Sequence, residues 1–141
     1  MKTKIRYTAA ILVFVLLVIG TLSTCQRDSD RWVHKAQPEN TLQVDQLLDG
    51  LSSNDSHLIN DVIAVDGFVA EVNYLNDRAT VLLRGSAEEK ISVICDMQEN
   101  QKEQLALLEV GQPITIKGIL KGSLNDVILL NCMISNSPNH D

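Results

Sequence analysis

The chain has 141 residues, which leaves room for one compact domain with short appendages, because a second independent core would deplete the first. Its hydrophobic fraction of 45% and charged fraction of 21% are those of a globular protein, although one N-terminal run holds part of the apolar total. The formal net charge is −6, and from Gln26 onward nine basic residues face all 18 acidic ones, so this part carries about −9. A negative field of this kind repels phosphate backbones and argues against nucleic acid as a partner.

The first 25 residues form the predicted membrane anchor. Lys2, Lys4 and Arg6 precede an uncharged apolar run from Thr8 to Leu22. A basic start followed by an apolar stretch directs a chain into the secretion machinery, and the basic residues stay on the cytoplasmic side. We therefore expect the rest of the chain to lie outside the cytoplasm.

Three fates fit this anchor segment. A helix that runs to Thr24 is about 25 Å long, which is short for a bilayer core of about 30 Å but feasible with local thinning, so an uncleaved transmembrane signal-anchor is our first interpretation. The second is lipidation at Cys25, because residues 22–25 (Leu-Ser-Thr-Cys) resemble the bacterial lipobox, in which Gly, Ala or Ser usually stands where this chain has Thr24. The third is a cleaved signal peptide, for which we find no clear Ala-x-Ala-like site.

Residues 26–40 are polar, mixed in charge and contain Pro38, and we interpret them as a tether to a folded domain at 41–135. From Thr41 to Leu51 the apolar residues recur near helical spacing, with Asn40 or Thr41 as the cap, which predicts a short amphipathic helix. Residues 136–141 form a polar tail.

The remainder of the domain is β-like. Strands are predicted over residues 62–72, 80–84, 90–97, 110–118 and 126–134. Gly67 inside the first strand indicates a bulge or a sharp coil. A second helix is expected over residues 99–108, between the third and fourth strands. This order predicts a mainly β fold, a five-stranded OB-type Greek-key barrel with a helix between strands three and four.

Several motifs in these strands resemble a known family. The chain carries Val-Asp-Gly at 65–67, Val-Ile-Cys at 93–95, a Leu-x-x-Gly-x-x-Ile-Thr-Ile-Lys-Gly stretch at 108–118, and a closing Val-x-Leu-x-x-Cys strand at 127–132. From about Thr41 to Ile134 the chain resembles the tRNA-anticodon-like OB domains of small bacterial membrane or lipoprotein-like proteins. The resemblance implies the fold but no activity, since OB barrels host many unrelated functions.

A nucleic-acid ligand needs a positive groove and aromatic side chains on which bases stack. From Asp61 to Ile134 the chain offers six basic residues against eleven acidic ones, with Phe68 and Tyr74 as its aromatics. We expect Phe68, next to Gly67, in the core, which leaves Tyr74 as the single candidate for stacking.

No catalytic, metal or cofactor site is indicated. His57 is the histidine nearest the folded region, and it has no nucleophile or orienting acid at recognisable spacing. Glu88 and Glu89 are adjacent carboxylates, but a charge pair on a turn is usually solvated. The cysteines form no CxxC pair and the histidines are scattered, so no metal site is predicted. We therefore predict a protein that is not an enzyme.

Strand alternation places Cys95 and Cys132 on the inward faces of the third and fifth strands. These strands are neighbours in an OB barrel, so the two sulfurs are candidates for a disulfide outside the cytoplasm. The alternative is two buried thiols that act as small hydrophobic residues. Sequence alone leaves both open.

A ligand face, if present, is expected on the outer surface of strands two and three and on the loops that join strands one to two and four to five. The candidate residues there are Tyr74, Arg78, Arg84, Ser92 and Lys121. The predicted function is a membrane-anchored, extracytoplasmic binding or interaction module for a protein or small ligand. The alternative is a nucleic-acid-binding OB domain.

Overall fold

The computed structural model describes residues 28–38, 41–52, 56–86, 88 and 90–135. The chain divides into two compact units, Met1–Trp32 and Val33–Asp141. Residues 28–35 are helical, and the β-rich fold lies in the second unit. The predicted anchor with Cys25 and the predicted tail lie outside the described residues. Within those residues, no helix has the length and apolar character needed to cross a bilayer.

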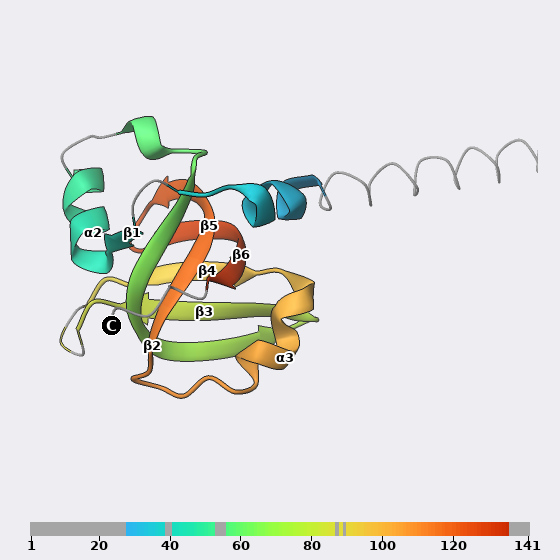
Figure 1. The fold of residues 1–141 in the computed structure, drawn as a ribbon. Helices are drawn as coiled ribbons and strands as arrows, with labels where there is room; N and C mark the ends of the chain where they lie inside the picture. The colour runs from blue at the N-terminus through green and yellow to red at the C-terminus, as the bar shows by residue number, and fades with distance from the viewer. Residues whose placement is uncertain (1–27, 39–40, 53–55, 87, 89, 136–141) are drawn as a thin grey trace, which may run out of the picture. The chain divides into compact units, whose positions relative to one another are not determined.

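Five strands of the second unit close into a barrel (Figure 1). They are β2 (Val62–Leu75), β3 (Arg78–Arg84), β4 (Val93–Met97), β5 (Pro113–Ser123) and β6 (Val127–Ser135). Around the barrel the order is β2-β3-β4-β6-β5, and β5 pairs back onto β2. The β4–β6 pairing is parallel, whereas the other pairings in the barrel are antiparallel. This is the OB topology, so the predicted fold is confirmed.

The long strand β2 belongs to both halves of the barrel. Its residues 62–68 pair with β5 and its residues 68–75 pair with β3. A register shift between Val69 and Glu71 marks a bulge, slightly beyond the glycine at which a bulge or coil is predicted. Gly67 itself is a point of close packing, because a Cβ there would lie 2.9 Å from Val44 Cγ2. The strand therefore bends where it passes from one neighbour to the other.

A tight turn joins β2 to β3. It consists of Asn76 and Asp77, whose φ angles are 49° and 65°. Positive φ at both central residues suits a two-residue hairpin, since its twist matches that of the flanking strands. The turn expected over residues 73–78 is therefore shorter than the sequence indicates, and both strands extend into it.

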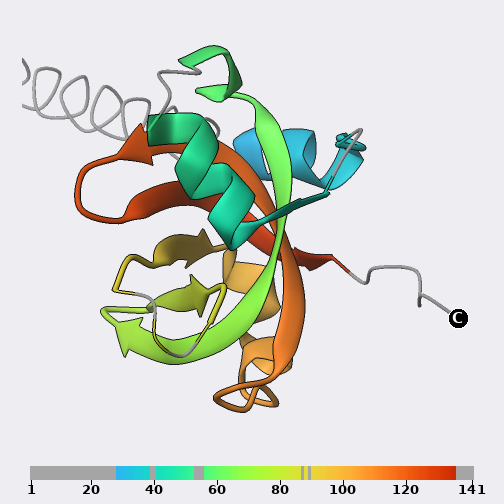
Figure 2. The same ribbon diagram turned by 90° about the vertical axis from the view of Figure 1, so that its left-hand side faces the viewer.

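The segment before the barrel differs from its prediction. Residues Thr41–Gln43 form β1, a short strand parallel to β2, and the helix α2 (Val44–Ser52) begins three residues later than expected. Val44 and Leu47 of α2 are buried in the core, and Figure 2 shows the helix on the outside of the barrel beside β2. The 3-10 turn η1 (Ser56–Leu58) then leads into β2. Thr41–Gln43 is extended because the edge of β2 supplies a hydrogen-bonding partner there.

The barrel interior is filled by alternate, mostly aliphatic residues of the strands. The buried members from β3, β4, β5 and β6 include Val81, Leu83, Val93, Cys95, Ile116, Leu120, Val127, Leu129 and Cys132. The helical link between β4 and β5 consists of η2 (Glu99–Gln101) and α3 (Lys102–Leu105). It lies over one end of the barrel in Figure 1, and Leu105 is buried in the core. This link ends three residues before the predicted end at Leu108.

Two buried glutamines complete the edge of β6, which extends beyond the end of β4. Gln98 donates from its backbone N–H to the carbonyl of Cys132 and from Nε2 to the carbonyl of Asn131, at 2.8 Å in each case. Gln101 Oε1 accepts the N–H of Ile134 at 3.0 Å. These bonds satisfy N–H and carbonyl groups of β6 that lie partly or fully away from solvent.

Candidate functional site

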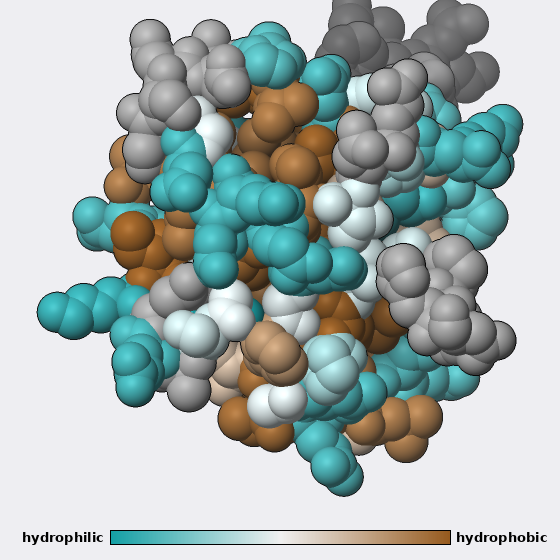
Figure 3. All heavy atoms as spheres, turned by 60° about the vertical axis from the view of Figure 1, so that its left-hand side comes forward, coloured by the Kyte–Doolittle hydropathy of each residue, from teal (hydrophilic) through white to brown (hydrophobic). Residues whose placement is uncertain are grey.

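The surface of the barrel carries large apolar side chains. On the face drawn in Figure 3, hydrophobic side chains (brown) come to the surface among hydrophilic ones (teal), most clearly along the lower edge of the view. Exposed apolar residues include Phe68, Tyr74, Leu75, Leu107, Val110 and Leu124. Because single exposed apolar residues are common on protein surfaces, the hollows beside them are the features that can mark an interaction site.

The first candidate site is a hollow of about 730 Å³ on the outer surface of β3, β4 and β6, which we call the strand-face hollow. Residues that line it include Tyr74, Leu75, Arg78, Ile94, Asp96, Ile128 and Leu130. Ile94 lies opposite Leu82 of β3 on one side and Ile128 of β6 on the other, so an aliphatic row crosses three strands. At the β2–β3 turn, Tyr74 is 57% exposed and Leu75 is 73% exposed.

The charge in the strand-face hollow is paired. Arg78 Nη2 donates to Asp96 Oδ2 from the neighbouring strand. The hydrogen bond to Asp96, together with its negative charge, raises the pKa of Arg78 above the ordinary value. Arg78 is the one cation among the residues that line this hollow, and its charge is matched by a carboxylate. The hollow therefore presents an apolar surface with one neutralised ion pair.

The structure divides the five predicted ligand-binding residues among different places. Tyr74 and Arg78 line the strand-face hollow, whereas Arg84 lines a different one, about 460 Å³ in volume, beside Phe68. Ser92 is buried, and its Oγ accepts Arg84 Nε at 3.2 Å. Lys121 Nζ donates to Asn60 Oδ1 at 2.9 Å, and neither hollow includes it. The five residues therefore do not form a single site.

The expectation that Phe68 lies in the core is wrong. Its side chain is 46% exposed, and on the sheet it stands between Pro113 of β5 and Arg84 of β3. The reason is the alternation of β2, in which Val65 and Val69 are buried and Phe68 takes an outward position.

Sequence reasoning missed the aliphatic row itself. A strand with one solvated face alternates apolar and polar residues. In residues 81–83 and 127–130 the outward positions are apolar too, giving continuous apolar runs, Val-Leu-Leu and Val-Ile-Leu-Leu. Those continuous apolar runs were the sequence signal that the outer face of β3 and β6 is apolar and differs from a normal solvent-exposed strand face.

Cys95 and Cys132 both point inward and are buried, as strand alternation predicts. In the structure both are free thiols. Burial raises the pKa of the Cys132 thiol well above its ordinary value, and contact with the Cys95 thiol adds to the rise. The disulfide stays a prediction about the oxidised protein.

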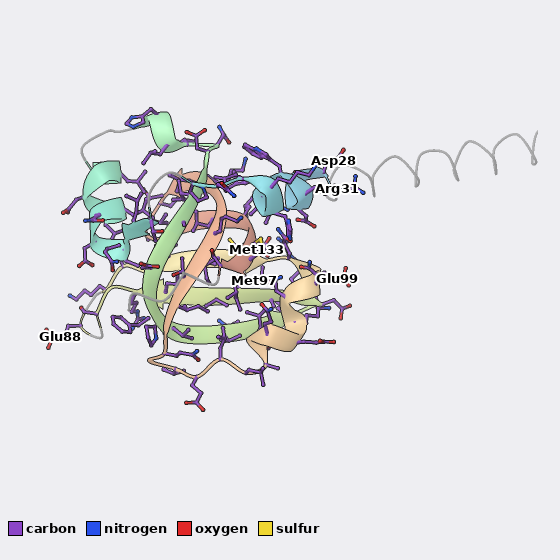
Figure 4. The ribbon with its side chains drawn as sticks, in the orientation of Figure 1. Asp28, Arg31, Glu88, Met97, Glu99 and Met133 are labelled. Carbon is purple, nitrogen blue, oxygen red and sulfur yellow. The ribbon has the colours of Figure 1, made fainter. Side chains whose placement is uncertain are left out.

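Among the described residues, no cluster of three or more His, Cys, Asp or Glu side chains could hold a metal ion. His57 lies in η1 with an exposed side chain, and Glu88 projects from the β3–β4 loop away from the barrel (Figure 4). The features that remain as candidates for function are the two hollows, with the Arg78–Asp96 ion pair in one of them.

A family model described as tRNA_anti-like matches residues 1–134. The chain belongs to the tRNA_anti-like family. The resemblance found in the strand motifs is thereby confirmed, and the match includes residues that precede the folded domain. None of the curated proteins with which the chain was compared matches it significantly.

The tRNA_anti-like chain is similar to several solved structures. One is a protein of Klebsiella pneumoniae subsp. pneumoniae MGH 78578 described as a "putative nucleic acid-binding lipoprotein". It is 16% identical, with a TM-score of 0.59 over 69% of this chain and 92% of that one. Another is an OBody bound to hen egg-white lysozyme, 17% identical, with a TM-score of 0.46 over 58% of this chain and 87% of that one. At these identities the likeness to the Klebsiella protein concerns the fold alone.

Proposed function

We propose that this tRNA_anti-like chain is a non-catalytic binding module, held at a membrane outside the cytoplasm, whose strand-face hollow engages an apolar segment of another protein. The observation that carries the proposal is the aliphatic row Leu82, Ile94 and Ile128, bordered by exposed Tyr74 and Leu75. Apolar surface with a few aromatic side chains is the composition of protein-binding centres.

Nucleic acid fits this hollow poorly. Binders of single strands combine free cations with stacking aromatics, and each stacked base contributes about 1–3 kcal/mol. The cation that lines the hollow, Arg78, is paired with Asp96, and Tyr74 is the one aromatic residue that lines it. One stacked base falls short of the roughly 8 kcal/mol that a micromolar complex requires.

The alternative function is nevertheless supported by one comparison. The description of the Klebsiella protein contains both nucleic-acid binding and a lipoprotein. Applied to this chain, it favours a nucleic-acid ligand as the second candidate and acylation at Cys25 as the second form of the anchor. Both are outcomes of the experiments below.

The location outside the cytoplasm is part of the proposal. It is supported by the basic N-terminus and by the apolar run that follows it. If the helix is uncleaved, the N-terminus stays in the cytoplasm. If the chain is a lipoprotein, acylated Cys25 becomes the new N-terminus and the preceding residues are removed.

Photo-crosslinking of the full chain in its native membrane tests the function. A benzophenone amino acid replaces Leu75, at the hollow, or Leu107, which is 80% exposed and does not line it. We expect a light-dependent protein adduct from position 75 that is absent from position 107 and survives nuclease treatment. A nuclease-sensitive adduct from position 75 would instead establish the nucleic-acid alternative.

A titration of mixed-sequence DNA and RNA oligonucleotides with the purified full chain gives a second measurement. At an ionic strength of about 0.15 M, surface charges are screened beyond about 8 Å, so binding reports local contacts. We expect no saturation up to micromolar concentration. Saturable binding that Tyr74→Ala weakens would show that a local patch overrides the net negative charge.

A further inference from the structure

The hollow beside Phe68 differs in character from the strand-face hollow, and the two share no lining residue. We call it the Phe68 hollow and define it by Phe68, Ala70, Arg84, Ser86, Val110 and Gly111. Its volume of about 460 Å³ lies within the range of sites for small ligands. Phe68 is 46% exposed and Val110 is 76% exposed, so its wall is apolar and accessible.

Local structure brings these residues together. The chain before β5 continues beside β2, where Val69 N–H donates to Gln112 O at 2.9 Å and Gly111 N–H donates to Val69 O at 2.7 Å. These bonds place Val110 and Gly111 alongside the bulge at residues 69–71. On the other side of β2, Phe68 stands directly opposite Arg84. The bulge thus lies between β3 on one side and the turn before β5 on the other, and these two segments form the sides of the hollow.

Arg84 is half-buried and its charge has no carboxylate partner in the described part of the chain. Its Nε donates to Ser92 Oγ at 3.2 Å, which restrains the side chain. Its terminal nitrogens make no hydrogen bond or ion pair with a described residue, in contrast to Arg78, which is paired with Asp96. A guanidinium presents N–H donors in a fork that matches both oxygens of a carboxylate.

Three carboxylates on neighbouring elements make no ion pair with Arg84. Asp66, in the adjoining part of β2, accepts bonds from Thr115 Oγ1 and from Gln43 Nε2. Asp126 Oδ1 accepts the backbone N–H of Ser92 at 2.8 Å. Glu88 extends away from the barrel in Figure 4. Among the described residues, none pairs with the terminal nitrogens of Arg84, so these donors are available to a ligand.

We propose that the Phe68 hollow binds a small organic carboxylate with an apolar or aromatic tail. The carboxylate pairs with the terminal nitrogens of Arg84, and the tail lies against Phe68, Ala70 and Val110. Phosphate is a poorer match, because the remaining wall of the hollow is mainly apolar and offers no second cation. The inference is independent of the proposed protein-binding function, since it concerns separate residues.

The probe is 4-fluorophenylacetate, which carries a carboxylate, an aromatic ring and a fluorine nucleus for NMR. The full chain in lipid nanodiscs is titrated with this acid and with its neutral isostere, 4-fluorophenylacetamide. We expect saturable binding of the acid to be at least about tenfold tighter than that of the amide, because a hydrogen-bonded ion pair is lost in the amide. Equal binding of acid and amide, or no saturable binding of either, overturns the proposal without any change to the protein.

Matched variants locate the site. Arg84→Gln should weaken binding of the acid by about tenfold or more. Arg78→Gln, the same change at the arginine of the strand-face hollow, should leave this binding unchanged. Val110→Glu places a competing carboxylate at the rim of the Phe68 hollow and should also weaken binding of the acid. Leu107→Glu adds the same charge at a nearby exposed position and should leave the binding unchanged. Circular dichroism of each variant confirms the fold. Loss of binding in Arg78→Gln or Leu107→Glu equal to that in its partner variant would refute the assignment.

The same carboxylate chemistry occurs at the C-terminus of a peptide. A tetrapeptide that ends in phenylalanine with a free carboxylate, and its amidated form, therefore compete against the fluorinated acid. If only the peptide with the free carboxylate displaces the fluorinated acid, the ligand carboxylate belongs to a peptide C-terminus. If neither peptide displaces it, the ligand is a free organic acid. Equal displacement by both forms contradicts a role for the carboxylate.

Discussion

At the scale of single residues, two glycines in the strands are fixed by lack of room. Gly67 faces the first residue of α2, and Gly118 lies where β5 passes over β6 with a register shift between Lys117 and Ile119. A Cβ at position 118 would lie 2.5 Å from Cys132 Sγ and 3.2 Å from the carbonyl oxygen of Leu130. The glycine therefore permits close packing of the two strands over the buried thiol.

Gly118→Ala should lower the free energy of unfolding by about 1–3 kcal/mol, because an added methyl group in a filled core forces neighbouring atoms to move. Urea denaturation measures the change. Gly50→Ala is the matched control: a Cβ there meets nothing within 4 Å, and alanine in helix α2 should leave stability unchanged or raise it by up to about 1 kcal/mol. An equal loss in both variants would show that packing against Cys132 is not the cause.

The buried thiol of Cys132 makes stability depend on alkaline pH. Burial raises the pKa of Cys132 in the folded chain, whereas a cysteine in an unfolded chain ionises near pH 8.5. Above about pH 8.5 the unfolded state therefore binds fewer protons, and the free energy of unfolding falls as pH rises. Between about pH 7.5 and about pH 9.5, with a reductant present, wild type should lose about 1 kcal/mol more than Cys132→Ala. Identical losses in the two proteins would contradict the raised pKa.

At the scale of elements, side chains at the start of the link between β4 and β5 form hydrogen bonds to the backbone of β6, where a neighbouring strand would otherwise pair. Gln101 is 7% exposed, and its Oε1 accepts the N–H of Ile134. Gln101→Leu removes this acceptor and should cost about 1 kcal/mol, the lower end of the range for an unpaired donor, because the N–H of Ile134 is partly buried. Gln104→Leu, an equal change at an exposed position of α3, should stay within about 0.5 kcal/mol of wild type. Thermal or urea unfolding distinguishes the two.

The five barrel strands could be predicted because their inward residues alternate and because turn residues separate them. The short elements could not. Leu42, Val44 and Leu47 have a spacing that suits a helix, and only the free edge of β2 determines that Thr41–Gln43 is a strand. A turn was predicted before β3, but its two-residue length was not, because residues 73–75 are exposed and give no inward alternation to extend β2 to Leu75.

The candidate site was less predictable than the fold, and for a physical reason. Alternation indicates that Arg78, Arg84 and Lys121 are outside the barrel, but their partners come from other elements. Asp96 lies 18 positions from Arg78, and Asn60 lies 61 positions from Lys121. Whether a cation is free or neutralised depends on those partners, so the sequence could not distinguish paired Arg78 from Arg84.

At the scale of the whole molecule, the anchor and the barrel carry opposite charge. The basic N-terminal residues favour the cytoplasmic side, which leaves the domain after the apolar run on the other side of the membrane. Protease added outside the cytoplasm should therefore digest the domain in intact spheroplasts, and immunoblotting of the fractionated membranes measures its loss. Protection until the cells are lysed would reverse the proposed topology.

The form of the anchor is tested by Cys25→Ala. If the N-terminal segment is an uncleaved helix, as we expect, the variant keeps the mass of the full chain apart from the substitution and stays with the membrane, because an alanine near the end of an apolar helix does not impair insertion. If Cys25 is acylated, the variant loses incorporation of labelled fatty acid and accumulates as an unprocessed chain. Intact-mass spectrometry and metabolic labelling with palmitate separate the two, and Cys95→Ala, which removes a buried thiol of the barrel, is the control that neither model expects to change processing. A mature wild-type chain that begins at an acylated Cys25 would replace the spanning helix with a lipid anchor, and the domain would still lie outside the cytoplasm.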